Sequence, residues 1–250
     1  MQSDPSGYAE RCRALERGAG CSFRPSVLSL PRPPDVYPPA PPRRQVFVEY
    51  GDFESLPAGS SWPGWTVYSP SPSLVRVSDE RAASGTHSLC VTDDGKPGYR
   101  PFLESLVYRA GGPLRIAFDL YLERGARPRF ETRDNDAYVL AAGPVVSVDA
   151  QGRFCAGDGR VLCDAVYGKW LHIELSCLLG GESTPVYSLE IAVPGEPAPR
   201  RWADLRMHPR FTSLGWTGII SHAAGAERFF VDNFTISDPE TPAEEKGRRK

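Results

Sequence analysis

The fold class is decided by the alternating stretch Leu114-Arg115-Ile116-Ala117-Phe118-Asp119-Leu120-Tyr121-Leu122. Successive side chains of a strand point to opposite faces, so every second residue of this stretch lies on one side. One side is apolar at all of its positions, and the other carries Arg115, Asp119 and Tyr121. This pattern is typical of an antiparallel strand that buries one face in a core and turns the other toward solvent.

Strand-like runs of the same kind follow one another from Gln45 to Ser237. Turn clusters such as Gly111-Gly112-Pro113 separate them, and no segment sustains the helical period of about 3.6 residues. The sequence therefore predicts an all-β domain, a two-sheet sandwich or a barrel, rather than a parallel α/β sheet. The predicted strands are Val46–Tyr50, Leu74–Val77, Ser88–Thr92, Leu114–Leu122, Arg129–Arg133, Val145–Val148, Arg153–Ala156, Trp170–Cys177, Tyr187–Val193, Gly218–Ser221 and Phe229–Ile236.

The two ends of the chain differ in composition from this β region. Residues 1–44 hold nine of the 25 prolines, and such a run favours extended polyproline geometry that cannot nucleate a core. We predict a proline-rich segment or linker over residues 1–44, a β-sandwich over residues 45–238 and a charged flexible tail over residues 239–250. A ligand for a proline-recognition domain is the alternative reading of the first segment.

Composition excludes several classes of function. The chain has 250 residues, is 40% hydrophobic and 24% charged, and carries a net charge of −2, which is ordinary for a soluble globular protein. This charge provides no electrostatic case for binding nucleic acid or an anionic membrane. No stretch approaches the roughly 18 to 20 apolar residues of a membrane span, and the N-terminus lacks the apolar run of a secretion signal. The compartment stays open: intracellular, or extracellular if the chain belongs to an exported precursor.

The six cysteines show no zinc-type spacing and are too few for a disulfide scaffold. Cys155 and Cys163 flank a hairpin turn. A three-residue loop would place them opposite each other, whereas a two-residue loop would put them on opposite faces and forbid a bridge. We favour free, partly buried thiols, because free cysteine behaves as a small hydrophobe.

Phe229–Ile236 is a strand-like run with a carboxylate in its middle. Alternation from Phe230 to Ile236 places Asp232 on the more apolar side, so we predict that it points toward the core. An ionised carboxylate there needs a cation or several hydrogen-bond donors. Because Asp52 and Glu54 lie near the start of the β region, the sequence suggests that the first and last strands meet around a structural cation. The alternative is that Asp232 accepts backbone N–H bonds.

Six motifs follow one another along the chain: Asp52-Phe53-Glu54, Pro63-Gly64-Trp65, Val75-Arg76-Val77, Ala83-Ser84-Gly85-Thr86-His87-Ser88-Leu89, Gly168-Lys169-Trp170-Leu171-His172-Ile173 and Phe230-Val231-Asp232-Asn233-Phe234. The order resembles the jelly-roll modules of the concanavalin A-like lectin/glucanase kind, either LamG-like or carbohydrate-binding-module-like, found at the C-terminus of large bacterial polysaccharide-processing or surface proteins. The resemblance covers residues 46–238. It implies a two-sheet antiparallel jelly-roll sandwich that acts as a non-catalytic, carbohydrate-binding accessory module, with a glycan and other domains of a longer polypeptide as partners.

The resemblance also implies a metal site. In the calcium-containing members of these families, the cation joins the first strand to the last. Carried over to this sequence, the ligands are Glu54, the turn that begins at Ser84, and Asp232. Oxygen ligands of this kind suit a hard cation such as Ca²⁺.

Sugar recognition combines aromatic faces, on which sugar rings stack, with a few fixed polar groups. Trp62 lies in a loop, and two predictions for it stay open: a platform on which a sugar ring stacks, or a core residue. Trp202, which lies between Arg201 and Ala203, is predicted to be the exposed tryptophan. Trp65, Trp170 and Trp216 are predicted to be core residues.

The densest polar segment runs from Arg127 to Asp136. On a strand, Arg129, Glu131 and Arg133 share one face, where guanidinium groups would bind sugar hydroxyls or uronate carboxylates. The alternative is a solvated strand face with internal ion pairs, each of little energetic value.

Catalysis is the second reading. The chain lacks the closely spaced carboxylates of sandwich glucanases, and turn formation explains Asp134 and Asp136 better than chemistry does. Jelly-roll polysaccharide lyases generally use a Tyr or His base beside an Arg or Asn that neutralises the uronate, which casts His172, Arg133 and Tyr138 in those roles. We favour a structural role for His172. A purely structural module that binds protein is the third reading.

Overall fold

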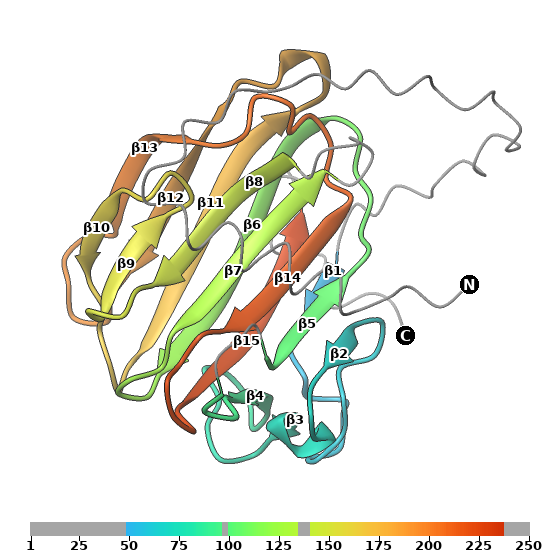
Figure 1. The fold of residues 1–250 in the computed structure, drawn as a ribbon, viewed down its shortest axis with the longest axis vertical. Helices are drawn as coiled ribbons and strands as arrows, with labels where there is room; N and C mark the ends of the chain where they lie inside the picture. The colour runs from blue at the N-terminus through green and yellow to red at the C-terminus, as the bar shows by residue number, and fades with distance from the viewer. Residues whose placement is uncertain (1–48, 97–99, 135–140, 238–250) are drawn as a thin grey trace, which may run out of the picture. The chain divides into compact units, whose positions relative to one another are not determined.

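The computed structural model describes residues 49–96, 100–134 and 141–237, which form two antiparallel sheets packed face to face (Figure 1). The predicted all-β sandwich is therefore confirmed. Residues 1–44 and 239–250 lie outside the described residues, so the proposed division of the chain stays a prediction. Within the described ranges, no helix is both long and apolar enough to cross a bilayer.

Sheet A contains the two terminal strands of the described chain. β1 (Glu49–Gly51) pairs with β15 (Arg228–Ser237) with Tyr50 opposite Thr235, which confirms that the first and last strands meet. The remaining strands lie in the order β13 (Arg200–Arg206), β12 (Val186–Ala192), β11 (Trp170–Leu179), β6 (Gly112–Leu122), β15, β4 (Ser88–Thr92) and β3 (Val75–Ser78).

Sheet B forms the other layer. β2 is the edge strand nearest the start of the chain, and β10 is the edge strand at the other side. The strands lie in the order β10 (Val161–Asp164), β9 (Arg153–Ala156), β8 (Ala141–Val148), β7 (Pro128–Asp134), β14 (Trp216–Ser221), β5 (Phe102–Ser105) and β2 (Thr66–Tyr68).

The core lies between the sheets, and β6 shows how the sequence builds it. Its predicted apolar face is almost completely buried, and each large aliphatic side chain buried in this way contributes about 1.5 to 3 kcal/mol. The face consists of Leu114, Ile116, Phe118, Leu120 and Leu122.

Four strands were not predicted from the sequence: β2, β5, β10 and β13. β2, β5 and β10 have only three or four residues each, and β13 is rich in arginine. β2, β10 and β13 are edge strands, which hydrogen-bond to one neighbour and need little apolar surface of their own. Whether such a strand forms depends on the neighbouring strand with which it pairs, and the local sequence pattern does not indicate which strand that is.

The predicted orientation of β15 is wrong in its first half. Asn233 adopts a left-handed backbone conformation with φ of +50°, and the register with β6 shifts between Asp232 and Thr235. This bulge breaks the two-residue alternation. Phe229 and Val231 therefore join the core with Phe234 and Ile236, whereas Phe230 and Asp232 turn to the outer side of sheet A.

The β9–β10 hairpin decides the question left open for its cysteines. Cys155 lies opposite Val161, and Cys163 lies opposite Phe154, so the two thiols are not cross-strand partners. Cys90, Cys155, Cys163 and Cys177 are all free thiols, whereas Cys12 and Cys21 lie outside the described residues.

Candidate functional site

A continuous chain of contacts crosses the outer face of sheet B. Register places the side chains of β2, β5, β14 and β7 on this face, because directly opposite residues share a side. We call this set the sheet B face: Tyr68, Phe102, Glu104, Trp216, Arg129, Glu131 and Arg133.

Trp216 forms the centre of the sheet B face. Its ring lies over Gly218, where an added Cβ would sit 2.1 Å from Trp216 Cη2, so only glycine leaves room for it. The guanidinium carbon of Arg133 lies 4.4 Å from the centre of the ring, within the range of a cation–π contact. Trp216, predicted to be a core residue, is buried, but on the outer side of the sheet.

Glu131 joins two guanidinium groups beside this tryptophan. Its Oε2 accepts from Arg129 Nε and its Oε1 from Arg133 Nε, both at 2.6 Å. Only 7% of the Glu131 side chain is exposed. Burial acts to raise the pKa of Glu131, but the charges and hydrogen bonds of Arg129 and Arg133 outweigh it and hold that pKa below its usual value.

The other end of the sheet B face is aromatic. Tyr68 stacks on Phe102 with ring centres 4.3 Å apart, and its hydroxyl donates to Glu104 Oε1 at 3.0 Å. The second oxygen of Glu104 accepts from Trp216 Nε1. Glu104 therefore connects the exposed Tyr68 and the half-buried Phe102 to the tryptophan, and through it to the arginines.

His222 lies just beyond β14 and adds a titratable group to the basic end. Its backbone N–H donates to the carbonyl of Arg127 at 3.0 Å. Burial, and next the positive charges of Arg129 and Arg127, lower the pKa of His222 to about 4. The imidazole is therefore neutral at physiological pH.

Trp62 and Trp202, the two tryptophans predicted to bind sugar, do not lie on the sheet B face. Trp62 is 5% exposed and stacks on Trp65 with ring centres 4.2 Å apart, whereas Trp202 is half-buried on β13 of the other sheet and packs against the core. Trp170, predicted to be a core residue, is half-buried on the outer side of sheet A, where its ring contacts Tyr121.

The described residues that were considered for catalysis do not lie together in one site. His172 is on sheet A, where its Nδ1 lies 2.7 Å from Asp119 Oδ1, so the structure does not bring it to Arg133. Asp134 Oδ2 accepts from the backbone N–H of Ser213 at 3.1 Å, which is a structural arrangement. Tyr138 and Asp136 lie outside the described residues.

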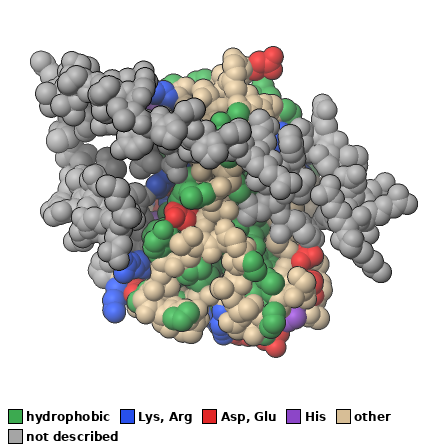
Figure 2. Space-filling view, turned by 90° about the vertical axis from the view of Figure 1, so that its right-hand side faces the viewer, with side chains coloured by type: hydrophobic (Ala, Val, Ile, Leu, Met, Phe, Trp, Pro, Cys, Tyr) green, Lys and Arg blue, Asp and Glu red, His purple; other side chains and the backbone are tan. Residues whose placement is uncertain are grey.

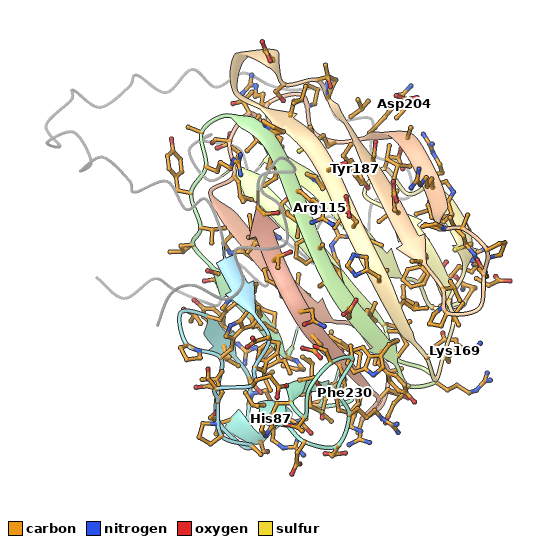
Figure 3. The ribbon with its side chains drawn as sticks, turned by 180° about the vertical axis from the view of Figure 1, so that it is seen from behind. His87, Arg115, Lys169, Tyr187, Asp204 and Phe230 are labelled. Atoms are coloured by element: carbon orange, nitrogen blue, oxygen red, sulfur yellow. The ribbon has the colours of Figure 1, made fainter. Side chains whose placement is uncertain are left out.

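Glu54, Ser84 and Asp232 converge on one loop, the turn from Ala83 to His87. Asp232 Oδ2 accepts from the backbone N–H groups of Ala83 at 2.9 Å and Ser84 at 3.2 Å. The carboxylate of Glu54 accepts from the backbone N–H groups of Thr86 at 3.0 Å and His87 at 2.8 Å. Figure 3 shows this end of sheet A from its outer side, with His87 and Phe230 labelled.

These contacts do not match the donor set expected for calcium. A cation needs oxygens that point toward it, whereas both carboxylates here accept hydrogen bonds from N–H groups of the turn, with Glu54 still partly exposed to solvent. Among the described residues, no three His, Cys, Asp or Glu side chains gather in a way that would hold a metal ion. Calcium at Glu54, Ser84 and Asp232 stays a prediction, and its binding would require the turn to reorganise.

We expect Asp232 to make folding more favourable as the pH falls. Burial raises the pKa of Asp232 to about 6, although its backbone hydrogen bonds oppose the shift. The unfolded value is about 3.9, so the folded state binds the proton more tightly, and this contribution is lost as the pH rises through about 6. Between pH 7 and pH 5 the free energy of unfolding should gain about 1 kcal/mol from this group.

Urea denaturation at pH 5 and pH 7 measures this change. The comparison is with Asp232→Asn, which keeps every histidine and removes only the one carboxylate. Equal pH dependence in both proteins would contradict the assignment.

The pKa of Glu54 is shifted in the opposite direction. Backbone hydrogen bonds from His87 and Thr86 lower this pKa, so the contribution of Glu54 to stability is lost only as the pH falls through that lowered value.

The sequence predicted that Arg129, Glu131 and Arg133 share one face. It did not predict the aromatic end of the sheet B face. Glu104, Tyr68 and His222 received no role, because β2 and β5 were not predicted and His222 follows a strand end. One signal was available: Trp216-Thr217-Gly218 places a glycine two residues from a tryptophan on the same face, which is typical of a ring lying flat on its strand.

Comparison with solved structures supports the fold assignment. An endo-β-1,4-glucuronan lyase from the fungus Trichoderma reesei matches with a TM-score of 0.51 and 13% identity, over 78% of this chain and 96% of that chain. An alginate lyase from Aplysia kurodai matches with a TM-score of 0.51 and 11% identity, over 67% of this chain and 88% of that chain. No protein-family model matches the sequence, and no curated protein resembles it closely. The chain has a jelly-roll sandwich of the concanavalin A-like kind, a fold that it shares with these polysaccharide lyases.

Proposed function

We propose that the sheet B face binds a glycan that carries anionic groups, and that the chain acts as a carbohydrate-binding module. The proposal is supported by one arrangement: aromatic rings and guanidinium groups lie in one continuous row from Tyr68 to Arg129. Aromatic surfaces beside fixed polar groups are the usual means of holding sugar rings and their hydroxyls.

Arg129 is the residue best placed to contact the ligand. Its contact with Glu131 uses only Nε, and among the described residues no hydrogen bond engages its two terminal nitrogens. These nitrogens form the fork that matches a carboxylate. The positive charges of Arg129 and Arg127 both lower the pKa of His222, so both guanidinium groups lie within electrostatic range of the same imidazole.

We expect Arg129→Ala to weaken glycan binding about tenfold or more, because a hydrogen bond to a charged group contributes about 1.5 to 3 kcal/mol. A glycan array on the full chain identifies the ligands, and titration calorimetry compares the variants. Arg201→Ala is the matched control, because Arg201 is exposed on sheet A. Unchanged affinity in a folded Arg129→Ala protein would contradict the proposed role of the face.

A polysaccharide lyase is the second candidate, favoured by the neutral imidazole of His222. In such a reaction, His222 would take the proton beside the uronate carboxylate while Arg129 neutralises that carboxylate. A C=C bond would then form as the C–O bond to the leaving sugar breaks, the departing oxygen would take a proton from water, and an unsaturated uronate would remain. The test is an assay for unsaturated uronate on every glycan that binds, repeated with His222→Gln. Binding without product supports the non-catalytic module.

A further inference from the structure

A separate cavity opens beside the turn that follows β1. It has a volume of about 200 Å³, and its lining includes Asp52, Phe53, Ser55 and Trp62. One water molecule needs only about 10 to 15 Å³ on the same measure, so the cavity has room for a small organic molecule. Figure 2 views the side of the molecule on which β1 and β2 lie, where hydrophobic side chains are interspersed with polar groups.

The aromatic wall of this cavity is held in place. Gly51 leaves the space that Trp62 fills, because an added Cβ would lie 2.6 Å from Trp62 Cζ2. Trp62 is fixed by its stack on Trp65 and by edge contacts with Phe53 at 4.9 Å and Phe234 at 5.3 Å. Rings packed in this way are ordered before any ligand arrives, which lowers the entropic penalty of binding.

The backbone beside the cavity is strained. Phe53 has φ of +62°, a left-handed conformation that is unfavourable for a bulky side chain. Strain of this kind amounts to about 1 to 3 kcal/mol and gathers at functional sites. Phe53 lies between Asp52 and Ser55 in the chain, and both of these polar residues line the cavity.

The polar groups of the cavity retain unused hydrogen-bonding capacity. Asp52 Oδ1 accepts from the backbone N–H of Glu54 at 3.2 Å, and within the described chain Oδ2 accepts no hydrogen bond. The hydroxyl of Ser55 is exposed and likewise has no partner among the described residues. A carboxylate accepts well from sugar hydroxyls and repels other carboxylates.

We infer that this cavity binds one neutral sugar unit, with Asp52 and Ser55 hydrogen-bonding to its hydroxyls above a floor formed by the largely buried rings of Trp62 and Phe53. The site is distinct from the sheet B face, where guanidinium groups favour anionic groups, and the inference does not depend on the role of that face. Together the two sites would suit a polysaccharide with both neutral and acidic units.

The test is nuclear magnetic resonance of the full chain titrated with methyl β-glucoside, methyl β-galactoside and methyl β-xyloside. We expect at least one of them to shift the indole N–H signal of Trp62 and the amide signal of Ser55 in a saturable way. Methyl β-glucuronide should bind at least tenfold more weakly than that glycoside, because its carboxylate would face Asp52.

Variants separate this site from the other one. Asp52→Ala should weaken binding about tenfold, and Asp52→Asn, which keeps an oxygen for the Glu54 N–H, should also weaken it. Asp79→Ala is the exposed control, and Arg129→Ala should leave the shifts unchanged. The inference is overturned if none of the three glycosides shifts Trp62, or if Asp52→Ala and Asp52→Asn bind as tightly as the original chain.

Discussion

Replacing Glu131 with alanine is expected to lower the free energy of unfolding by about 3 kcal/mol. The substitution leaves the guanidinium groups of Arg129 and Arg133 close together without the carboxylate that lies between them. Removing one member of a buried ion pair is strongly destabilising, because the remaining charges are poorly solvated. The partial exposure of Arg129 keeps the effect at the lower end of the usual range.

Urea denaturation at neutral pH measures this effect against a matched control. Glu190→Ala removes a carboxylate that pairs with Arg201 at 3.1 Å on sheet A, where 68% of the arginine side chain is exposed. Exposed pairs contribute about 0 to 1 kcal/mol, so the control should change little. A loss below about 1 kcal/mol in Glu131→Ala would show that the triad is solvated like the control pair.

A triple variant tests the physical cause. Combining Arg129→Met, Glu131→Leu and Arg133→Met removes all three charges and keeps similar volume. Because a buried ionic cluster often contributes little relative to apolar side chains, the triple variant should be more stable than Glu131→Ala alone. It should also lose glycan binding. A stable protein without affinity would indicate that the charges serve recognition rather than stability.

Asp232→Ala is expected to lower the free energy of unfolding by about 1 to 3 kcal/mol, because it removes the acceptor of three backbone N–H groups. Its carboxylate is fully buried and accepts from the backbone N–H groups of Ala83, Ser84 and Asn233. Without the carboxylate, the turn that holds Ala83 and Ser84 loses its hydrogen bonds to β15. Hydrogen exchange should therefore show faster opening of residues 83–87 in the variant.

Calcium and a chelator distinguish the two accounts of Asp232. If it only accepts N–H bonds, the melting temperature of the original chain should be the same in calcium and in chelator. A rise in calcium that disappears in Asp232→Ala would instead support the metal site implied by the resemblance. Asp94→Ala is the control, because Asp94 only accepts a local turn N–H, from Lys96 at 3.0 Å.

Strand alternation on its own predicted the fold class and most of the sandwich. The strand at Leu114–Leu122 and the shared face of Arg129, Glu131 and Arg133 follow from a two-residue period, whereas the pairing of the terminal strands was inferred from the acidic residues near both ends of the β region. That period is local, since it depends only on the order of polar and apolar residues. The chain order of the motifs was likewise sufficient to indicate the jelly-roll kind.

Tertiary structure alone decided where the charges and rings point. The bulge at Asn233 turned Asp232 away from the core and under a distant loop, and the register of β14 with β7 placed Arg133 over Trp216. Both outcomes depend on which strands lie side by side and in what register, and a single residue of slip reverses a whole face. Alternation within a strand carries no information about register between strands, so only the assembled sheets bring Tyr68, Trp216 and Arg129 into one row.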